Sequence, residues 1–427
     1  MQAGFAKACV NPPLGMPMEG LGQQGGIQAI HDDLYVRALY LAHGGEQVLI
    51  IGCDLLFFTR AQVDRLKGAI GRAVDLTPRQ IFLNCSHTHA GPRLTPWSYT
   101  GEVEPLYFAQ VEAALTQAAA AAKATPTAVT LEAGMARTDV PVSRRKVDAA
   151  GKASWAPYRA GPVCDALPIT LVTDADGRVV CLLFSVSCHP STWYELDVSA
   201  DYPGVATRLL NAHFDTDGAL FLQGCGGDTK AYTIAVGEDH WRRGAWADVE
   251  QAGKDVADAV IARVAQGLTP VQPDLAACRF DMPWRLEPIP PKDWFQGVLA
   301  DPDERPERKS WAEEMLARLA RFGSLPQTLP VGIHGVKLGA GLRLVGMEGE
   351  AVAEIGALLL DYYQTGVTFP MGYTDGAQIY LTVSHMREEG SYEVDSYWEY
   401  HVPAPLAAGM EETMLEALDE LKACGID

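Results

Sequence analysis

Short apolar runs alternate with longer helical segments along this chain, and that order limits its fold more than any other feature. The strand-like runs lie at Leu34–Leu41, Gln47–Cys53, Ile81–Cys85, Ala128–Ala136, Pro168–Thr173, Val179–Ser187, Ala219–Gln223, Leu275–Phe280, Val331–Leu338, Leu342–Val345 and Val367–Met371. Helical spacing marks Thr59–Ala73, Pro105–Ala122, Ala200–Phe214, Ala245–Gln266, Lys309–Arg321, Ala351–Tyr362 and Ala404–Cys424. Because the two kinds of segment interleave, we predict an α/β or α+β fold with a mixed sheet core flanked by helices.

One segment departs from this order. Residues 283–330 are rich in proline and charge, with a single helical stretch. We interpret this segment as an insertion or lid.

The composition of the chain limits its possible binding partners and its cellular compartment. The formal net charge of −20 argues against nucleic acid or an anionic membrane surface as the main partner. Nine cysteines without a CxxC pair, several inside apolar runs, favour buried thiols in a reducing compartment. No secretory signal pattern and no membrane-span pattern is visible, so we expect a cytoplasmic protein without stable membrane association.

Two histidines follow one of the predicted strands. Cys85-Ser86-His87-Thr88-His89-Ala90-Gly91-Pro92 comes directly after the apolar run that ends at Asn84. In a strand, side chains two residues apart point to the same face, so His87 and His89 are expected to reach one point in space. Converging imidazoles suit zinc. A pair of hydrogen-bonded histidines near a turn would give the same pattern.

Other polar residues also lie where apolar runs stop. His189 follows Val179–Ser187, and Asp228 follows Ala219–Gln223 through a glycine-rich turn. Glu350 precedes the predicted helix at Ala351–Tyr362, where ordinary helix N-terminal electrostatics is an alternative explanation. Ligand sites of α/β sheets gather at such edges, so these residues are candidates for one site.

Taken in order, these motifs resemble the neutral (non-lysosomal) ceramidase superfamily. The matching blocks are Asn11-Pro12-Pro13-Leu14-Gly15, Ser86-His87-Thr88-His89-Ala90-Gly91-Pro92, Ser143-Arg144-Arg145, Cys188-His189-Pro190, Gly227-Asp228, Gly349-Glu350, Tyr380-Leu381-Thr382 and Tyr392-Glu393. They span nearly the whole chain. The resemblance implies one ceramidase-like catalytic domain over residues 1–427, without the immunoglobulin-like domain that follows in ceramidases.

The resemblance also implies a set of site residues. Its implied zinc ligands are His87, His189, Glu350 and Tyr380. Its implied catalytic residues are His89 for proton transfer, Arg144 and Tyr392 at the scissile amide, and Asp228 in the Gly-Asp dipeptide. Zinc lowers the pKa of a bound water and polarises a carbonyl, while arginine and tyrosine stabilise an oxyanion. Taken alone, Tyr380 is also consistent with an ordinary strand aromatic, and Arg144 with a solvated basic face.

The chain departs from ceramidases at the nucleophile. Ceramidases carry a serine in a GD-x-S-P pattern, whereas this chain reads Gly227-Asp228-Thr229-Lys230-Ala231. Lys230 therefore takes the serine position, either to bind an acidic group or the oxyanion, or as a surface lysine. The change argues against ceramide and favours attack by metal-activated water on a small soluble substrate.

Three functions follow. The first is a zinc-dependent hydrolase of an amide or ester bond. The second is a zinc-dependent lyase or glycosidase acting on a carbohydrate derivative, which the loss of the serine permits. The third is a non-catalytic relative that keeps the metal as a structural clamp. The sequence leaves the substrate and the oligomeric state open.

Overall fold

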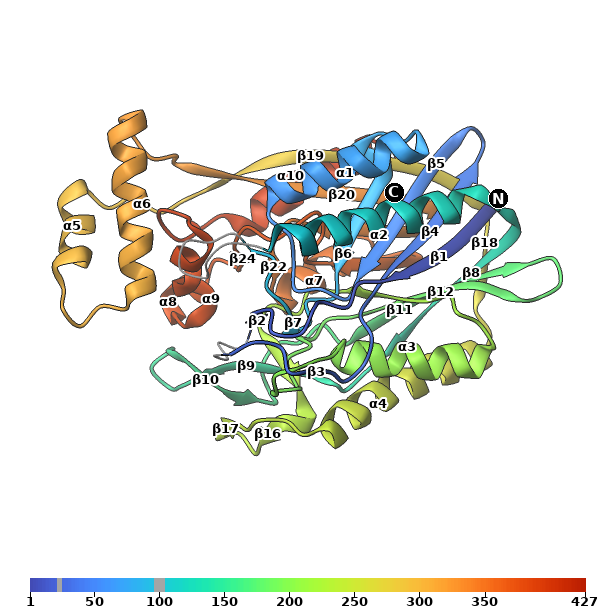
Figure 1. Cartoon of the computed structure of the whole chain (residues 1–427), viewed down its shortest axis with the longest axis horizontal. Helices are drawn as coiled ribbons and strands as arrows, with labels where there is room; N and C mark the ends of the chain where they lie inside the picture. The colour runs from blue at the N-terminus through green and yellow to red at the C-terminus, as the bar shows by residue number, and fades with distance from the viewer. Residues whose placement is uncertain (21–24, 96–103) are drawn as a thin grey trace.

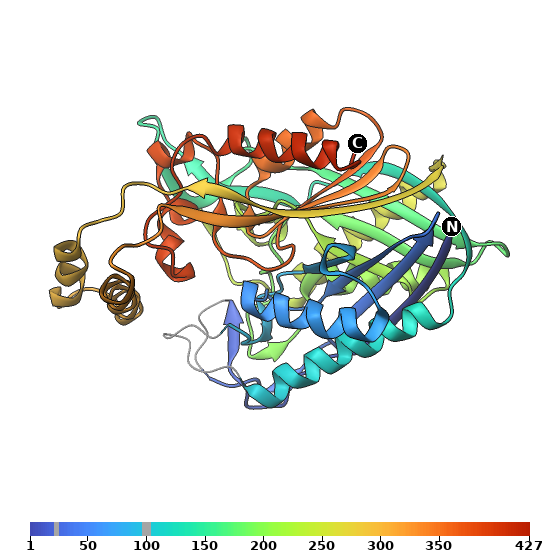
Figure 2. The same cartoon turned by 90° about the horizontal axis from the view of Figure 1, so that it is seen from above.

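The computed structural model of the chain describes residues 1–20, 25–95 and 104–427. Two β-sheets pack face to face, and helices cover the outer face of each sheet, so that four layers follow one another (Figures 1 and 2). The prediction of a mixed sheet flanked by helices is confirmed.

The larger sheet contains most of the first half of the chain. Its strand order is β14 (Ala219–Gln223), β12 (Val179–Val186), β11 (Ala166–Asp174), β8 (Thr127–Arg137), β1 (Gln2–Cys9), β4 (Tyr35–His43), β5 (Glu46–Cys53) and β6 (Ile81–Cys85), with β18 (Thr269–Val271) added beside β8. The pairs β5–β6 and β12–β14 are parallel and the others are antiparallel. The sheet is therefore mixed.

The second sheet comes from later in the chain. It consists of β19 (Pro273–Arg285), β20 (Thr328–Gly339), β21 (Leu342–Met347) and β23 (Val367–Met371), with β21 and β23 parallel. Five small sheets, one of three strands and four of two, hold the other strands of the described residues. They join β2 (Met18–Gly20) to β7 (Ala90–Pro92), β3 (Ala29–Ile30) to β13 (Asp197–Val198), β9 (Pro141–Val147) to β10 (Ala153–Tyr158) and β15 (Thr229–Ala231), β16 (Ala235–Val236) to β17 (His240–Trp241), and β22 (Glu350–Ala351) to β24 (Tyr380–Leu381).

The helices divide between the two outer layers. The larger sheet is covered by α1 (Arg60–Val74), α2 (Pro105–Ala124), α3 (Asp201–Phe214) and α4 (Trp246–Ala265), and the second sheet by α7 (Ala353–Tyr362) and α10 (Met410–Ala423). Between β24 and α10 lie α8 (Met386–Glu389), α9 (Tyr392–Asp395) and a short 3-10 turn, η3 (Ser396–Tyr400). Two further 3-10 turns are η1 (Pro78–Gln80) and η2 (Tyr232–Ile234). No described helix is long and apolar enough to cross a bilayer.

Burial of both sheet faces explains the nearly continuous apolar strands. In β4, Val36 and Ala38 face the helices, whereas Leu39 and Leu41 face the second sheet. Alternate side chains of one strand thus enter two different cores. A strand buried on both faces needs apolar residues at successive positions rather than at every second one.

Strands occupy both ends of the segment at 283–330. β19 runs on to Arg285 and β20 begins at Thr328, so the ends of the segment belong to the second sheet. Between them, α5 (Lys292–Ala300) and α6 (Pro306–Phe322) form a hairpin that projects from the body (Figures 1 and 2). The sequence pattern did not predict α5. It predicted that the last helix begins at Ala404, whereas α10 begins at Met410 in the structure.

A buried cluster of charges ties the two sheets together. Asp375 is 1% exposed and contacts Lys67 Nζ at 2.6 Å, His334 Nδ1 at 2.9 Å and Arg279 Nε at 3.2 Å. Its backbone N–H donates to the carbonyl of Leu83 on β6 (2.7 Å), so the loop before β24 runs along that strand. Burial alone would raise the pKa of Asp375, but the surrounding cations hold it well below its ordinary value.

We predict that Asp375→Asn strongly destabilises the fold, because it leaves the Lys67 ammonium buried without its counter-ion. The expected loss is about 3–5 kcal/mol in urea unfolding. Asp176→Asn is the matched control, since Asp176 pairs with Arg178 on the open surface and is expected to cost at most about 1 kcal/mol. Similar losses for the two variants would contradict the structural role of the cluster.

Candidate metal centre

His87 and His89 lie in a turn beyond β6, not in a strand. β6 ends at Cys85, and His87 has a left-handed φ of 66°. The side chains converge because the chain turns sharply between β6 and β7, so the expectation of one strand face was wrong. Backbone contacts hold the turn: His87 N–H donates to Leu55 O (2.9 Å) and His89 N–H to Pro190 O (3.0 Å).

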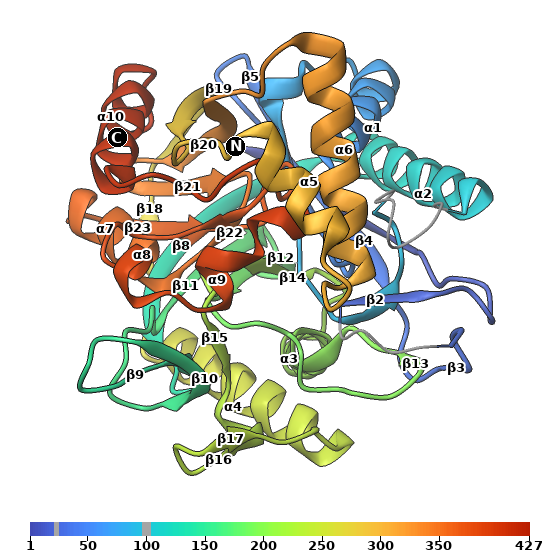
Figure 3. The same ribbon diagram turned by 90° about the vertical axis from the view of Figure 1, so that its left-hand side faces the viewer.

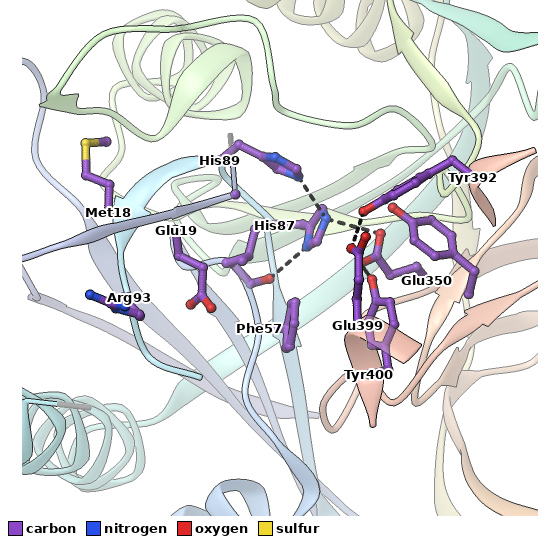
Figure 4. Close-up of a pocket in the computed structure, with 13 residues that line it drawn as sticks. Met18, Glu19, Phe57, His87, His89, Arg93, Glu350, Tyr392, Glu399 and Tyr400 are labelled. Atoms are coloured by element: carbon purple, nitrogen blue, oxygen red, sulfur yellow. Dashed lines mark hydrogen bonds and ion pairs between the residues drawn. The ribbon is translucent and has the colours of Figure 1, made fainter. Parts of the chain in front are cut away.

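His189 and Glu350 reach the same place from other elements. His189 follows β12, and Glu350 opens β22. His87 Nε2 and His189 Nε2 each lie 3.3 Å from Glu350 Oε2, and one nitrogen from each of His87, His89 and His189 falls within 4.8 Å of the others. Figure 4 shows His87 between His89 and Glu350. These four side chains are almost completely buried, except for the partly exposed His89.

Backbone carbonyls fix which nitrogen of each imidazole faces the centre. His87 Nδ1 donates to Leu56 O (3.0 Å), and His189 Nδ1 donates to Gly226 O (2.7 Å). Since a carbonyl only accepts, the Nε2 atoms of His87 and His189 carry lone pairs that point toward Glu350. His89 has no such anchor, because its Nδ1 is buried without a partner in the described part of the chain.

Electrostatics leaves this cluster short of positive charge. Burial lowers the pKa of His189 to about 3, and the guanidinium of Arg144 adds to the effect. Burial would raise the pKa of Glu350, but His87 and His189 hold it well below its ordinary value. His189 Nε2 is buried and has no hydrogen-bond partner among the described residues, so it is available to bind a cation beside the Glu350 carboxylate.

A divalent cation would satisfy this set of acceptors. Imidazole nitrogens and a carboxylate oxygen are typical zinc ligands. A histidine that binds zinc through one ring nitrogen commonly donates the N–H of its other ring nitrogen to a carbonyl. His87 and His189 both meet this criterion, whereas His89 does not. The residues present thus fit zinc, with His87, His189 and Glu350 as the better-anchored donors.

Tyr380 stands beside Glu350. The two residues are paired directly in the short parallel ladder of β22 and β24. The Tyr380 hydroxyl accepts a hydrogen bond from Arg144 Nη2 (3.1 Å), and the ring lies 6.5 Å from that of His189. Arg144 is buried rather than solvated: it is 2% exposed and its Nε donates to Glu393 Oε1 at 2.7 Å. Its guanidinium contacts Tyr380 instead of lining the cavity.

The site opens into a cavity of about 280 Å³. Glu350 and the tyrosines lie at one end, and Glu19 and Arg93 lie at the other (Figure 4). The lining residues are Met18, Glu19, Gly20, Leu56, Phe57, His87, His89, Arg93, Glu350, Tyr380, Tyr392, Glu399 and Tyr400. Tyr392 is 38% exposed, and its hydroxyl donates to Glu399 Oε2 (2.7 Å).

Sequence reasoning missed two tyrosines that hold the Glu350 carboxylate. The Tyr400 hydroxyl donates to Glu350 Oε1, and the Tyr373 hydroxyl lies 3.4 Å from Oε2. Tyr373 also has a left-handed φ of 51° and packs its ring 4.3 Å from that of His87. No motif marks either residue, because both lie in the looped region after β23, where the sequence has no periodicity.

Asp228 and Lys230 follow the Gly224–Gly227 turn and have different surroundings. Asp228 Oδ1 accepts from the backbone N–H of Ala353 at the start of α7 (2.8 Å), and burial raises the pKa of Asp228 to about 7. Lys230 is half-buried, and burial together with Arg144 lowers its pKa to about 8. Neither side chain lines the cavity.

Solved structures with the same fold exist. The chain aligns with the crystal structure of neutral ceramidase from Pseudomonas aeruginosa at a TM-score of 0.72 and 16% identity, over 98% of this chain and 73% of that one. It aligns with a structure titled "Ceramidase complexed with C2" at a TM-score of 0.73 and 15% identity, over 98% and 74%. No family model and no curated protein sequence matches. The protein has a ceramidase-like fold.

We predict that His189→Ala abolishes stoichiometric zinc binding, because it removes a buried donor whose orientation is fixed by Gly226. Zinc content after chelation and reloading, measured by elemental analysis, checks this. His240→Ala is the matched control, since His240 is an exposed histidine beside Asp239. Unchanged zinc in His189→Ala would contradict the assignment.

A second prediction concerns the support of Glu350. Tyr400→Phe removes the hydroxyl donor to Oε1 and keeps the ring. We expect zinc affinity to fall by about 10–100-fold, as for other groups that orient a metal ligand. Competition with a chromophoric chelator measures this, and Tyr362→Phe, which removes an exposed hydroxyl bonded to Asp419, serves as control. Equal affinities for both variants would rule out the supporting role.

Proposed function

We propose that this protein is a zinc-dependent hydrolase that cleaves an amide or ester bond in a small soluble substrate by attack of metal-activated water. The observation that carries the proposal is the meeting of His87 Nε2, His189 Nε2 and Glu350 Oε2 at one point, beside a cavity that His87 and Glu350 line. The ceramidase-like fold supports a hydrolase, because its solved representatives are named for that activity.

In this proposal, His87, His189, Glu350 and Tyr380 hold the metal. Zinc bound there would lower the pKa of a coordinated water toward 7 and polarise the substrate carbonyl. The pairing of Glu350 with Tyr380 across β22 and β24 supports including the phenol oxygen.

His89 serves as the general acid and base. Its Nε2 lies 3.1 Å from His87 Nε2, so the imidazole stands directly beside the position of the metal. Burial lowers the pKa of His89 well below its ordinary value, with further contributions from His87 and His189, which favours its basic form in the metal-free protein. As base, His89 accepts a proton from the attacking water and returns it to the leaving group.

Tyrosine hydroxyls and one arginine stabilise the charge that develops on the carbonyl oxygen. Tyr392 lines the cavity and presents its hydroxyl near the Glu350 end. Arg144 acts through Tyr380, since its Nη2 donates to that hydroxyl. Asp228 positions this group: its backbone carbonyl accepts from the N–H of Arg144 (2.8 Å), while its carboxylate secures the start of α7. Preorganised donors of this kind contribute strongly to acyl transfer.

Two features support a small soluble substrate rather than ceramide. The cavity of about 280 Å³ is near the lower limit for pockets that enclose drug-sized ligands. Lys230 replaces the serine that ceramidases use. The acidic balance of the chain disfavours nucleic acid or an anionic bilayer as partner, and the buried free thiols fit a cytoplasmic setting.

We predict that His89→Ala loses about 10²–10⁴-fold in kcat, the usual contribution of a positioned acid or base, while it keeps its zinc. The assay uses a panel of N-acyl and ester substrates, with His240→Ala as control. Zinc loss in His89→Ala would make His89 a ligand instead. Unchanged kcat would remove it from the mechanism.

Reaction in ¹⁸O-labelled water separates hydrolysis from elimination. Hydrolysis places one labelled oxygen in the acyl product, because the attacking oxygen comes from solvent. Product mass spectrometry checks this, with product incubated alone in labelled water as the control for exchange. Products that carry no label and sum to the mass of the substrate would instead indicate a lyase.

A further inference from the structure

Lys230 lies next to the metal centre and forms no ion pair with any described residue. The carboxylate that acts on its charge, that of Asp201, already accepts hydrogen bonds from three backbone N–H groups. It is the middle residue of β15, and its backbone forms a parallel bridge with His189. Through the part of the chain that the structure describes, its ammonium takes part in no hydrogen bond or ion pair. An unpaired, half-buried ammonium is unusual in a chain of net charge −20, which offers many carboxylates.

Two indole rings flank this ammonium. Lys230 Nζ lies 5.9 Å from the ring centre of Trp155 on β10 and 5.8 Å from that of Trp241 on β17. Figure 3 shows β9, β10, β15 and β17 gathered at the same corner of the molecule. We call Lys230, Trp155 and Trp241 the β15 corner. Cation–π contact orients the ammonium there without neutralising its charge.

The same corner holds a second unsatisfied donor. The indole Nε1–H of Trp241 is buried and has no acceptor among the described residues. A buried donor without an acceptor costs free energy, and in native proteins it commonly signals a missing water, ion or ligand. The β15 corner thus offers a positive charge and an N–H group, both in need of an oxygen acceptor.

Unlike Lys230, the neighbouring Arg144 already has hydrogen-bond partners for its charged group. Arg144 stacks 4.2 Å from the Trp155 ring centre, but its guanidinium donates to Glu393 and Tyr380. Trp155 in turn packs edge-on against Tyr392 at 5.4 Å, and Tyr392 lines the cavity at the metal centre. The β15 corner therefore adjoins the reacting end of the cavity.

We propose that the β15 corner binds a carboxylate on the leaving group of the substrate, so that the protein acts on N-acyl amino acids or similar acyl compounds with a free carboxylate. This rests on the proposed function. One ammonium with one indole N–H matches a monoanion, whereas phosphate sites usually combine an arginine fork or a helix N-terminus with several donors. The indole faces supply an apolar wall for the adjacent side chain.

The kinetic test compares N-acetyl-leucine with N-acetyl-leucinamide, which differ only in the carboxylate. The wild-type protein is expected to prefer the acid by about 10–100-fold in kcat/KM, the usual value of a charge-assisted hydrogen bond. Lys230→Met is expected to lose that preference, and Lys230→Arg to recover part of it. Lys152→Met is the matched control, because Lys152 is an exposed lysine beside β10 that donates to Glu388 O. A preference for the acid that survives in Lys230→Met overturns the proposal.

A binding test separates this proposal from the proposed function. Calorimetry and tryptophan fluorescence measure the binding of N-acetyl-leucine, N-acetyl-leucinamide and inorganic phosphate. Each compound is tested with the metal-free wild-type protein and with the metal-free Lys230→Met and Trp241→Phe variants. We expect only the acid to bind, at least about tenfold more weakly to Lys230→Met. Equal binding to wild-type and Lys230→Met, or a preference for phosphate, overturns the carboxylate site. Lys230-dependent binding of the acid without turnover of any substrate refutes the hydrolase and retains the site.

Discussion

The site depends on a buried group of acceptors, two imidazole nitrogens and one carboxylate, that have no cationic side chain of the described residues between them. Two backbone carbonyls, of Leu56 and Gly226, take the Nδ1 protons of His87 and His189 and turn both Nε2 lone pairs inward toward Glu350. Such acceptors repel one another in a low-dielectric interior unless a cation lies between them. A metal ion therefore fits this centre as the group that makes the arrangement favourable, and the hydrogen bonds that select the tautomers prepare the site for it.

The four-layer fold brings these groups together from distant parts of the chain. His87 follows β6, His189 follows β12 and Glu350 opens β22, so the larger sheet and the second sheet both contribute. The loop before β24 supplies Tyr373, and the Asp375 cluster fixes that loop to β6. On the open side, η3 supplies Tyr400, and the α5–α6 hairpin packs Trp311 and Phe295 against Trp398 of the same turn. Thus the hairpin at 292–322 supports one wall of the cavity.

Apolar runs predicted the strands and most helices well, because a strand buried on both faces leaves a strong compositional signal. The sequence also predicted that His87, His189 and Glu350 lie near one another, since polar residues stand out where such runs stop. The reason given for convergence was nevertheless wrong: His87 sits in a left-handed turn, which no period-two pattern can reveal. Tyr400, Tyr373 and Glu393 were assigned no role because their importance comes from tertiary contacts alone. The motif around Arg144 suggested a solvated face, and only the buried carboxylate of Glu393 explains its true position.

Anomalous diffraction at the zinc absorption edge, on crystals of the zinc-loaded protein, tests the central claim most directly. The account predicts one strong peak at bonding distance, about 2.0–2.2 Å, from His87 Nε2, His189 Nε2 and Glu350 Oε2. A structure with these three atoms in place but no peak between them, or with the metal bound elsewhere, would contradict it.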